Sequence, residues 1–289
     1  MVVYNAKDWF GLIFKFHKAE TFHKLRLVML SLAVYTAIIC VIEIDVYHLQ
    51  YASTTAVHSL LGFVISLLLV FRTNTAYDRW WEGRKQWGAL VNVSRNFSLK
   101  INAFIPKEEK ERKMKLAAMT AAYSGVLRDH LRNESTFVVA SNLPDFMKDE
   151  VGDTEHIPNF LANAMQHSLL EMYQKEEISE GAYLAMLQDL NAFTDICGAC
   201  ERIKKTPIPY TYNIFIKKFI FAYIMTMPFG FVSDFGYFTV GITIFTFYAL
   251  ASLELIAEEI EDPFGKDSND LPTDGLAETI AKNVAEVVR

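Results

Sequence analysis

Long apolar runs alternate with charged stretches along the chain. Four of these runs are apolar enough, and nearly long enough, to cross a bilayer as helices, which takes about 20 residues each. They cover residues 25–44, 54–71, 214–232 and 235–256. The third run carries Lys217 and Lys218 near its start and Pro228 near its end, so a partly buried helix is an alternative for it. Because only residues 233–234 separate the third run from the fourth, these two are predicted to form a helical hairpin.

About half of the chain, residues 72–213, lacks such runs and has the pattern of helices in water. Strong helix formers with spaced apolar positions predict helices over 107–132, 159–173 and 180–204. The tail, residues 257–289, is turn-rich at first and ends in a predicted amphipathic helix over 276–288. The chain has no strand-like alternation of useful length, no internal repeat and no flexible linker. The sequence therefore predicts an all-α fold with four transmembrane helices and a helical cytoplasmic region in a single domain over 1–289.

Lysine and arginine predict how the chain crosses the membrane. Arg72, Arg79, Arg84 and Lys85 follow the second run closely, whereas the connections 45–53 and 233–234 contain neither residue type. Positive charge beside a span favours the cytoplasmic side. Region 72–213 and both termini are therefore predicted to be cytoplasmic, in a multi-pass protein of the cell inner (plasma) membrane. A helix lying in the interface is predicted before the first run from Trp9, Phe10, Ile13 and Phe14.

Composition and motifs narrow the functional classes. A net charge of -6 argues against a nucleic-acid partner, because proteins that bind nucleic acids normally carry a basic face. The chain has three cysteines, too few for a disulfide framework, and Cys197 and Cys200 lack the further ligands that zinc normally needs. They are interpreted as small residues on a helix. No phosphate-binding glycine loop, H-E-x-x-H or G-x-S-x-G motif occurs, so the chain is not predicted to be an enzyme.

A group of acids stands at the end of the fourth run: Glu254, Glu258, Glu259, Glu261 and Asp262. The main interpretation is a solvated face where the helix leaves the membrane. Catalytic or metal-binding carboxylates of a membrane enzyme are an alternative. A scaffold that binds a partner through residues 72–213 is another.

The second run carries two stripes at helical spacing. Small residues form the first: Thr55, Ser59, Gly62 and Ser66. They indicate that another helix approaches closely. Bulky residues form the second: Phe63, Leu67 and Phe71. Such a stripe most often faces lipid or a core, but several copies around an axis would form apolar rings that gate by dewetting. His58 is the one ionisable residue from 54 to 71, which favours a passive pore over a proton-coupled transporter.

A polar and aromatic segment, FRTNTAYDRWWEGRKQW, occupies residues 71–87 directly after the second run. Its notable members are Arg72, Asn74, Tyr77, Asp78, Arg79, Trp80, Trp81 and Glu82. An apolar helix ending in F-R-x-N and followed by Y-D-R-W-W-E-x-R-K-x-W resembles the bacterial branch of the bestrophin channel family. Further matches are Asn191, Cys197-Gly198, Pro207, Pro209, Tyr210 and the D-P-F-G of residues 262–265, where the family has N-P-F-G. The resemblance covers nearly the whole chain.

This resemblance implies a homopentameric ion channel in the lipid bilayer, with small monovalent ions as its permeant partners. By position, Phe63, Leu67 and Phe71 would form the pore neck, and a second, cytoplasmic constriction would lie near 178–182, with Ile178 as its candidate. Arg72, Asp78, Arg79 and Glu82 are then expected to pair within or between subunits and to hold the pore helix.

Two departures from the family pattern bear on cofactor and selectivity. Eukaryotic members bind calcium through acids directly after N-P-F-G, whereas this chain continues with Lys266, Asp267, Ser268, Asn269 and Asp270. No cofactor is predicted and calcium activation is not expected, with Asp267 and Asp270 as the remaining calcium-site candidates. Animal members conduct chloride, while bacterial relatives can favour monovalent cations. The net negative charge leans towards cations such as sodium, and chloride is the alternative.

Overall fold

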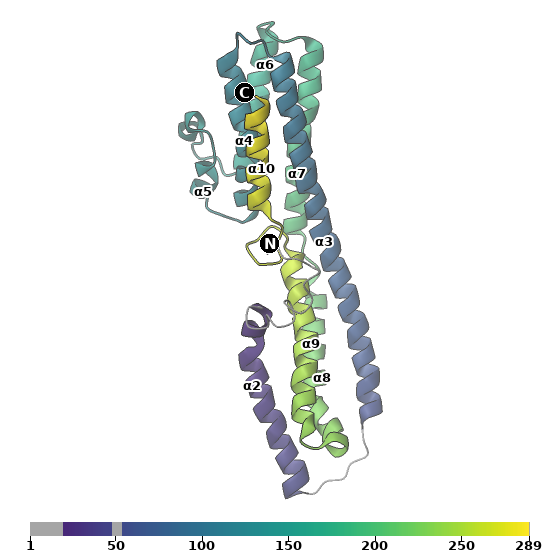
Figure 1. Ribbon diagram of the computed structural model, residues 1–289. Helices are drawn as coiled ribbons and strands as arrows, with labels where there is room; N and C mark the ends of the chain where they lie inside the picture. Colours follow the sequence, from purple (N-terminus) through teal and green to yellow (C-terminus); the bar gives the residue numbers. More distant parts are fainter. Residues whose placement is uncertain (1–19, 48–53, 289) are drawn as a thin grey trace. The chain divides into compact units, whose positions relative to one another are not determined.

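The computed structural model describes residues 20–47 and 54–288, and these residues form helices and connections without a strand (Figure 1). The all-α prediction is confirmed for this part of the chain. The interface helix predicted around Trp9 and Phe10 lies outside the described residues. The elements are α2 (Glu20–Val41), the π-helical turn η2 (Ile42–Val46), α3 (Thr55–Phe104), α4 (Lys110–Leu131), α5 (Thr136–Ser141), the 3₁₀ turn η3 (Asp145–Glu150), α6 (Ile157–Gln174), α7 (Glu180–Lys205), α8 (Tyr210–Phe235), α9 (Phe238–Glu261) and α10 (Thr273–Val287).

The chain divides into two compact units. Val2–Arg79 and Pro207–Glu261 form one, called here the membrane unit, and Trp80–Thr206 and Asp262–Arg289 form most of the other, called the bundle unit. The division falls inside α3, between Arg79 and Trp80. The expectation that residues 1–289 form a single domain stays a prediction.

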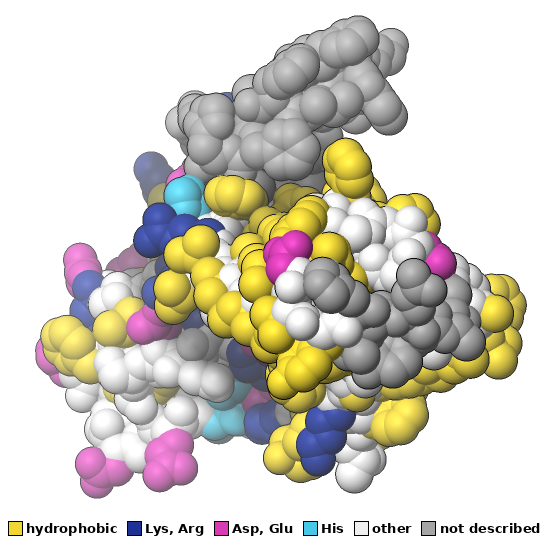
Figure 2. All heavy atoms as spheres, turned by 90° about the horizontal axis from the view of Figure 1, so that it is seen from below, with side chains coloured by type: hydrophobic (Ala, Val, Ile, Leu, Met, Phe, Trp, Pro, Cys, Tyr) yellow, Lys and Arg dark blue, Asp and Glu magenta, His cyan; other side chains and the backbone are white. Residues whose placement is uncertain are grey.

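The membrane unit contains the apolar helices. Segments Thr21–Val46, Thr55–Phe104, Tyr210–Phe235 and Phe238–Glu261 are each long and apolar enough to cross a bilayer, which confirms the four predicted runs, including the third. Helix α9 packs against both α2 and α8. Viewed from the end that carries the α8–α9 turn, hydrophobic side chains cover much of the outer surface of these helices (Figure 2). This surface is typical of helices that contact lipid.

The hairpin of α8 and α9 is confirmed, but its turn lies later than predicted. Helix α8 continues to Phe235, and the turn is made by Gly236 and Tyr237 rather than by residues 233–234. Gly236 has φ +52°, a positive value that glycine adopts without a Cβ clash, so it ends the helix. The polar residues at 233–234 were therefore a poorer guide to the turn than the glycine.

Helix α3 does not end where its apolar run ends. It continues from Thr55 to Phe104, through the whole polar segment 71–87, so the expectation that a helix stops at Phe71 was wrong. The first proline after this run is Pro106, and residues between them are compatible with helix. The change from apolar to charged residues marks a change of surroundings along one helix.

The bundle unit has the larger core. Helix α4 packs against α6 and α10, and α6 packs against α7. Trp87, Tyr123 and Phe193 are fully buried among them, and the Tyr123 hydroxyl donates to the Phe193 carbonyl oxygen at 3.1 Å. The helices predicted over 107–132, 159–173, 180–204 and 276–288 are α4, α6, α7 and α10, while the short elements α5 and η3 had no sequence signal long enough to predict them.

Candidate functional site

The bulky stripe of the second run lies on the outside of α3. Phe63 is 67% exposed, Leu67 46% and Phe71 56%. The opposite side of the helix carries Ile65 and Leu69, which are buried in the core of the membrane unit. Spacings of four residues keep each set on one face of the helix. The described chain thus presents an apolar stripe that none of its own helices covers.

The small residues of the same run are only partly explained by close helix packing. A Cβ on Gly62 would lie 2.9 Å from the Tyr223 hydroxyl oxygen on α8, so a side chain there would have to displace the Tyr223 ring that packs against α3. This confirms the close-approach interpretation at Gly62. Ser59 and Ser66 are exposed, and their hydroxyls donate to the carbonyl oxygens of Thr55 and Gly62 at 2.8 Å.

His58 is buried between α3 and α8. Its ring meets Phe231 edge-on, with centroids 5.5 Å apart, and its Nδ1 lies 3.2 Å from Thr54 Oγ1. A Cβ on Gly230 would come within 2.8 Å of the ring, so the glycine makes room for it. His58 therefore packs between helices and does not belong to the exposed stripe.

Arg72 anchors the same helix from within the membrane unit. Its side chain is fully buried, with Nη2 2.6 Å from Glu261 Oε2 and Nε 3.6 Å from Glu254 Oε2. The other Glu261 oxygen accepts from the Ile208 backbone nitrogen at 2.7 Å, and Arg79 Nε donates to the Glu261 carbonyl oxygen at 3.0 Å. These contacts join α3, the start of α8 and the end of α9. The expected pairing with acids thus occurs within one chain for Arg72, whereas the contact of Arg79 is with a backbone carbonyl oxygen.

The structure corrects the interpretation of the acids at the end of α9 as a solvated face. Glu254, Glu259 and Glu261 are buried, so a solvated face is wrong for them. Each lies beside a basic group distant in sequence: Arg72 for Glu254 and Glu261, and Lys24 for Glu259 at 3.0 Å. Glu258 is about half exposed and pairs with Lys217 at 2.9 Å. A local charge pattern does not reveal partners so far along the chain.

The rest of the polar segment divides between the surface and the bundle unit. Among its exposed members are Asn74, Tyr77, Asp78 and Trp81. Trp80 Nε1 donates to the Asn269 carbonyl oxygen at 3.0 Å. Glu82 pairs with Lys85 on the next helical turn at 2.5 Å and accepts from Gln86 at 2.8 Å.

The D-P-F-G loop folds against α3 in the bundle unit. Phe264 is buried, and a Cβ on Gly83 would lie 3.1 Å from its ring, so this glycine lets the loop approach. Asp270 is also buried, and its Oδ2 accepts from the Asp267 backbone nitrogen at 2.7 Å. Burial raises the pKa of Asp270 to about 7. The loop therefore holds a carboxyl group with reduced preference for the charged form.

The calcium candidates of this loop are not gathered into a ligand set. Neither Asp267 nor Asp270 belongs to a group of three or more metal-ligating side chains among the described residues. Nearby acids have cationic partners: Asp262 pairs with Lys204 at 2.5 Å. Lys266, which stands where eukaryotic relatives are expected to have acid, pairs with Glu134 at 2.6 Å.

Ile178 and the cysteine pair lie in the core of the bundle unit. Ile178 is 5% exposed, and this burial within its own chain argues against it as a residue that lines a constriction. Cys197 and Cys200 are buried, and desolvation raises the pKa of Cys197 to about 12. A neutral buried thiol is a poor metal ligand, which agrees with the interpretation of the pair as small core residues.

Comparison with known proteins gives the family of the chain. The model of the bacterial and fungal bestrophin protein family matches residues 1–286. The chain belongs to the bestrophin family. The resemblance carried by the polar segment and the D-P-F-G loop is thereby confirmed.

Similar proteins extend over most of this bestrophin. One is the voltage-dependent anion channel-forming protein sll1024 of Synechocystis sp., 36% identical over 238 residues, 79% of this chain and 76% of the relative. Another is the voltage-dependent anion channel-forming protein YneE of Escherichia coli K12, 30% identical over 284 residues, 97% of this chain and 91% of the relative. The crystal structure of a bestrophin homolog from Klebsiella pneumoniae has a TM-score of 0.84 and 26% identity, covering 92% of this chain and all of that one.

Family membership and the four apolar helices place this bestrophin in a membrane. They indicate a channel and not an enzyme, which agrees with the absence of catalytic motifs from the sequence. The orientation of the termini stays a prediction.

Proposed function

We propose that this bestrophin is a passive channel for small monovalent ions, built from five copies of the chain around one pore. The observation that carries the proposal is the exposed stripe of Phe63, Leu67 and Phe71 on a membrane helix of a bestrophin-family chain. In a ring of subunits each of these side chains becomes one layer of an apolar neck. Such layers exclude water until the pore widens, so they control whether an ion passes.

The packing of α3 supports this role. The buried face of α3 is held in place by the core residues Ile65 and Leu69 and by the ion pairs of Arg72. The stripe on the other face has neither core packing nor ion pairs of this sort within the described chain. A helix fixed on one side can present side chains on the other side at a constant radius. The stripe is thus suited to a neck whose width depends on side-chain volume. A cytoplasmic constriction near 178–182 is a further part of the proposal, although the burial of Ile178 favours an exposed neighbour as its lining residue.

Charge near the start of α3 supports cations as the favoured ions. Residues 27–71 and 219–265 contain no Lys or Arg, but they include the exposed acids Asp45 and Asp234. Asp234 Oδ2 accepts from the Thr55 hydroxyl at 2.7 Å, at the first turn of the proposed pore helix. An acidic entrance concentrates cations and repels anions. The names of the relatives support the second candidate, an anion channel.

Ion flux tests the proposal. Purified protein in liposomes with asymmetric NaCl is expected to give a current, and the sign of its reversal potential separates cation from anion conduction. Phe63→Ala and Leu67→Ala should increase conductance because they widen the neck. Val57→Ala is the matched control, since Val57 is an exposed apolar residue of α3 outside the stripe.

Two results would overturn the proposal. The first is the absence of flux for the wild type and for Leu67→Ala alike. The second is a detergent-solubilised particle whose mass, after correction for detergent, differs from five chains. Unchanged currents for both neck variants would assign the pore lining to another face of α3.

A further inference from the structure

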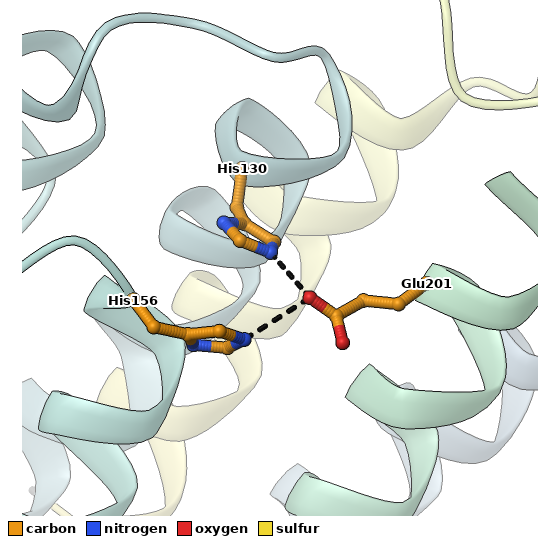
Figure 3. Close-up of side chains that lie close together, drawn as sticks. All are labelled: His130, His156 and Glu201. Carbon is orange, nitrogen blue, oxygen red and sulfur yellow. Dashed lines mark hydrogen bonds and ion pairs between the residues drawn. The ribbon is translucent and has the colours of Figure 1, made fainter. Parts of the chain in front are cut away.

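A group of metal-binding side chain types lies in the bundle unit, outside the proposed pore. His130 stands in the last turn of α4, His156 precedes the first residue of α6, and Glu201 lies near the end of α7. His130 Nε2 is 2.7 Å from Glu201 Oε1, and His156 Nε2 is 3.0 Å from the same oxygen. Figure 3 shows the two imidazole rings directed at this carboxylate from two different helix ends.

The donor set matches one class of metal ion. Two imidazole nitrogens with one carboxylate are a ligand combination of zinc sites that keep a fourth position for water. Calcium and magnesium prefer oxygen ligands, so nitrogen donors favour a transition metal. The side chains of His130, His156 and Glu201 are 22%, 34% and 19% exposed. An ion can therefore reach them from water and retain a water ligand.

The geometry requires little movement. The three donor atoms lie within 4.8 Å of one another. Zinc–nitrogen distances of about 2.0–2.1 Å in a tetrahedral site place neighbouring donors roughly 3.3 Å apart. The present nitrogen–oxygen distances of 2.7 and 3.0 Å would open by a few tenths of an ångström. Such a shift is within the reach of side-chain rotation.

The metal-free hydrogen bonds define what binding would change. His156 Nδ1 accepts from the Asn159 backbone nitrogen at 3.2 Å, so Nε2 carries the proton and donates to Glu201. Coordination through Nε2 moves the proton to Nδ1 and breaks this cap bond. Asn159 is exposed, so water can replace the acceptor. Lys205 Nζ is 3.6 Å from the same Glu201 oxygen, but its side chain is 71% exposed and can swing away.

The carboxylate is available as a charged ligand. Burial by itself would raise the pKa of Glu201, but the hydrogen bonds from His130 and His156 hold this pKa below its usual range. Protons compete with a metal for the imidazole nitrogens, so affinity is expected to fall in acid.

We propose that His130, His156 and Glu201 bind one divalent transition-metal ion of the Zn²⁺ class. The ion would link the end of α4, the start of α6 and the end of α7. Since it binds the folded bundle unit and not the unfolded chain, it would also stabilise this unit.

Metal titration of the full-length, untagged protein in detergent tests the site. After treatment with a chelator, the protein is titrated with ZnCl₂ by calorimetry and with CoCl₂ by visible absorption, which reports the coordination geometry. One ion per chain and a higher melting temperature with Zn²⁺ are expected. Loss of a residue that hydrogen-bonds a metal ligand commonly weakens metal binding about 10–100-fold. Loss of a ligand itself should weaken it at least as much, so His130→Ala and Glu201→Gln should bind at least about tenfold more weakly.

Two controls separate ligation from folding. His156→Asn removes the imidazole but keeps a side chain that caps a helix well, so it should lose the metal and retain α6. His167→Ala changes an exposed histidine of α6 outside the group and should leave binding unchanged. Wild-type protein that binds no ion at one per chain would overturn the proposal. Equal affinity of the wild type, His130→Ala and His156→Asn, each shown by circular dichroism to be helical, would do so too.

Discussion

The membrane unit and the bundle unit bury different kinds of side chain. The largest fully buried side chains of the bundle unit are aromatic and include Trp87, Tyr123 and Phe97, whereas in the described part of the membrane unit the largest is that of Arg72. Several aromatic residues of the membrane unit point outward instead: Phe63 is 67% exposed and Phe245 72%. Lipid solvates apolar side chains, so burying them between membrane helices adds little stability. Close helix contacts and buried ion pairs hold the membrane unit instead, and they leave exposed the apolar stripe that is proposed to line the pore.

The largest effect that would test this contrast is expected at Arg72. Arg72→Met leaves the carboxylates of Glu254 and Glu261 buried beside each other without a cation. Removing one partner of a buried ion pair costs about 3–5 kcal/mol. We expect a correspondingly lower melting temperature in detergent, measured by circular dichroism, and a smaller yield of assembled protein.

Two comparisons make the Arg72 experiment specific. Lys85→Met removes an exposed cation that pairs with Glu82 on the same helix, and it should change the melting temperature little. Adding Glu254→Gln and Glu261→Gln to Arg72→Met should recover part of the loss, because the remaining side chains are then neutral. Equal losses for Arg72→Met and Lys85→Met would show that the buried pairs do not hold the membrane unit.

The bundle unit should instead depend on its apolar core. Leu169→Ala removes a fully buried side chain and is expected to cost about 2–5 kcal/mol. Leu60→Ala makes the same chemical change on α3, where Leu60 is 65% exposed, and should leave the melting temperature nearly unchanged. The two variants are compared by thermal unfolding in one detergent. If Leu60→Ala were as damaging as Leu169→Ala, Leu60 would be covered by another subunit.

Asp270 adds a pH dependence to the bundle unit. Its pKa of about 7 in the folded protein exceeds the usual value of about 3.9 for an unfolded chain, so the native state binds this proton more tightly. Its contribution to stability is present below about pH 4 and is lost as the pH rises through about 7, at no more than about 1.4 kcal/mol per pH unit. Asp270→Asn keeps an oxygen for the Asp267 backbone nitrogen and cannot ionise.

Melting temperatures of the wild type and Asp270→Asn measured from pH 4 to pH 8 test this linkage. We expect the two curves to meet near pH 4 and the variant to be more stable at pH 8. Asp267→Asn is a control at a neighbouring carboxylate. A constant difference between the wild type and Asp270→Asn across the range would show that ionisation of Asp270 is not the cause.

The sequence predicted the elements of this protein better than their contacts. Four membrane helices and four helices of the bundle unit could be predicted because apolar runs and helical periodicity are local signals. The end assigned to α3 at Phe71 was wrong because a change in hydropathy is not a change in backbone preference. The turn before α9 was predicted too early because the polar residues at 233–234 continue the helix, and only the positive φ of Gly236 ends it.

Parts of the candidate sites that depend on distant residues had no local signal. Glu261 and Arg72 are 189 positions apart, so their pairing could not be read from either segment. The same holds for His130, His156 and Glu201, which appear in the sequence as scattered polar residues of three helices. The exposed stripe of α3 could be predicted, because Phe63, Leu67 and Phe71 lie within one helix at constant spacing.

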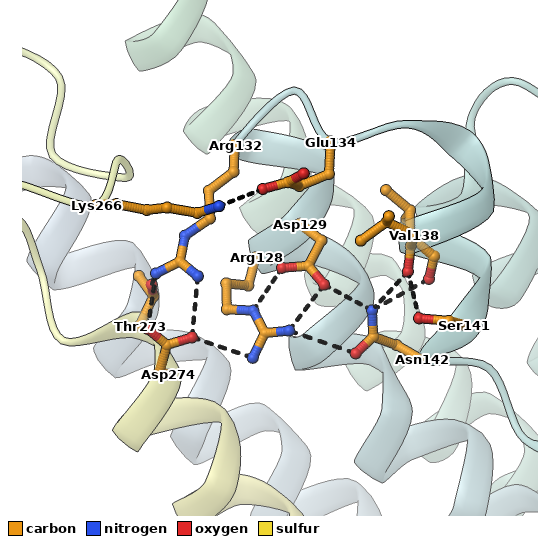
Figure 4. Close-up of polar contacts among 11 residues, drawn as sticks. Arg128, Asp129, Arg132, Glu134, Val138, Ser141, Asn142, Lys266, Thr273 and Asp274 are labelled. Atoms are coloured by element: carbon orange, nitrogen blue, oxygen red, sulfur yellow. Dashed lines mark hydrogen bonds and ion pairs between the residues drawn. The ribbon is translucent and has the colours of Figure 1, made fainter.

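The smallest effect is expected for the partly exposed ion pairs of the bundle unit, which contrast with those of Arg72. Figure 4 shows Arg132 directed at Asp274, with Nη1–Oδ1 and Nη2–Oδ2 distances of 3.0 and 2.8 Å. The hydrogen bonds from Arg132 lower the pKa of Asp274, but its side chain is 59% exposed to water. Asp274→Asn should therefore cost no more than about 1 kcal/mol. Thermal unfolding at low and high salt measures this cost, which salt should diminish; a loss as large as that of Arg72→Met would mean that burial does not separate the two networks.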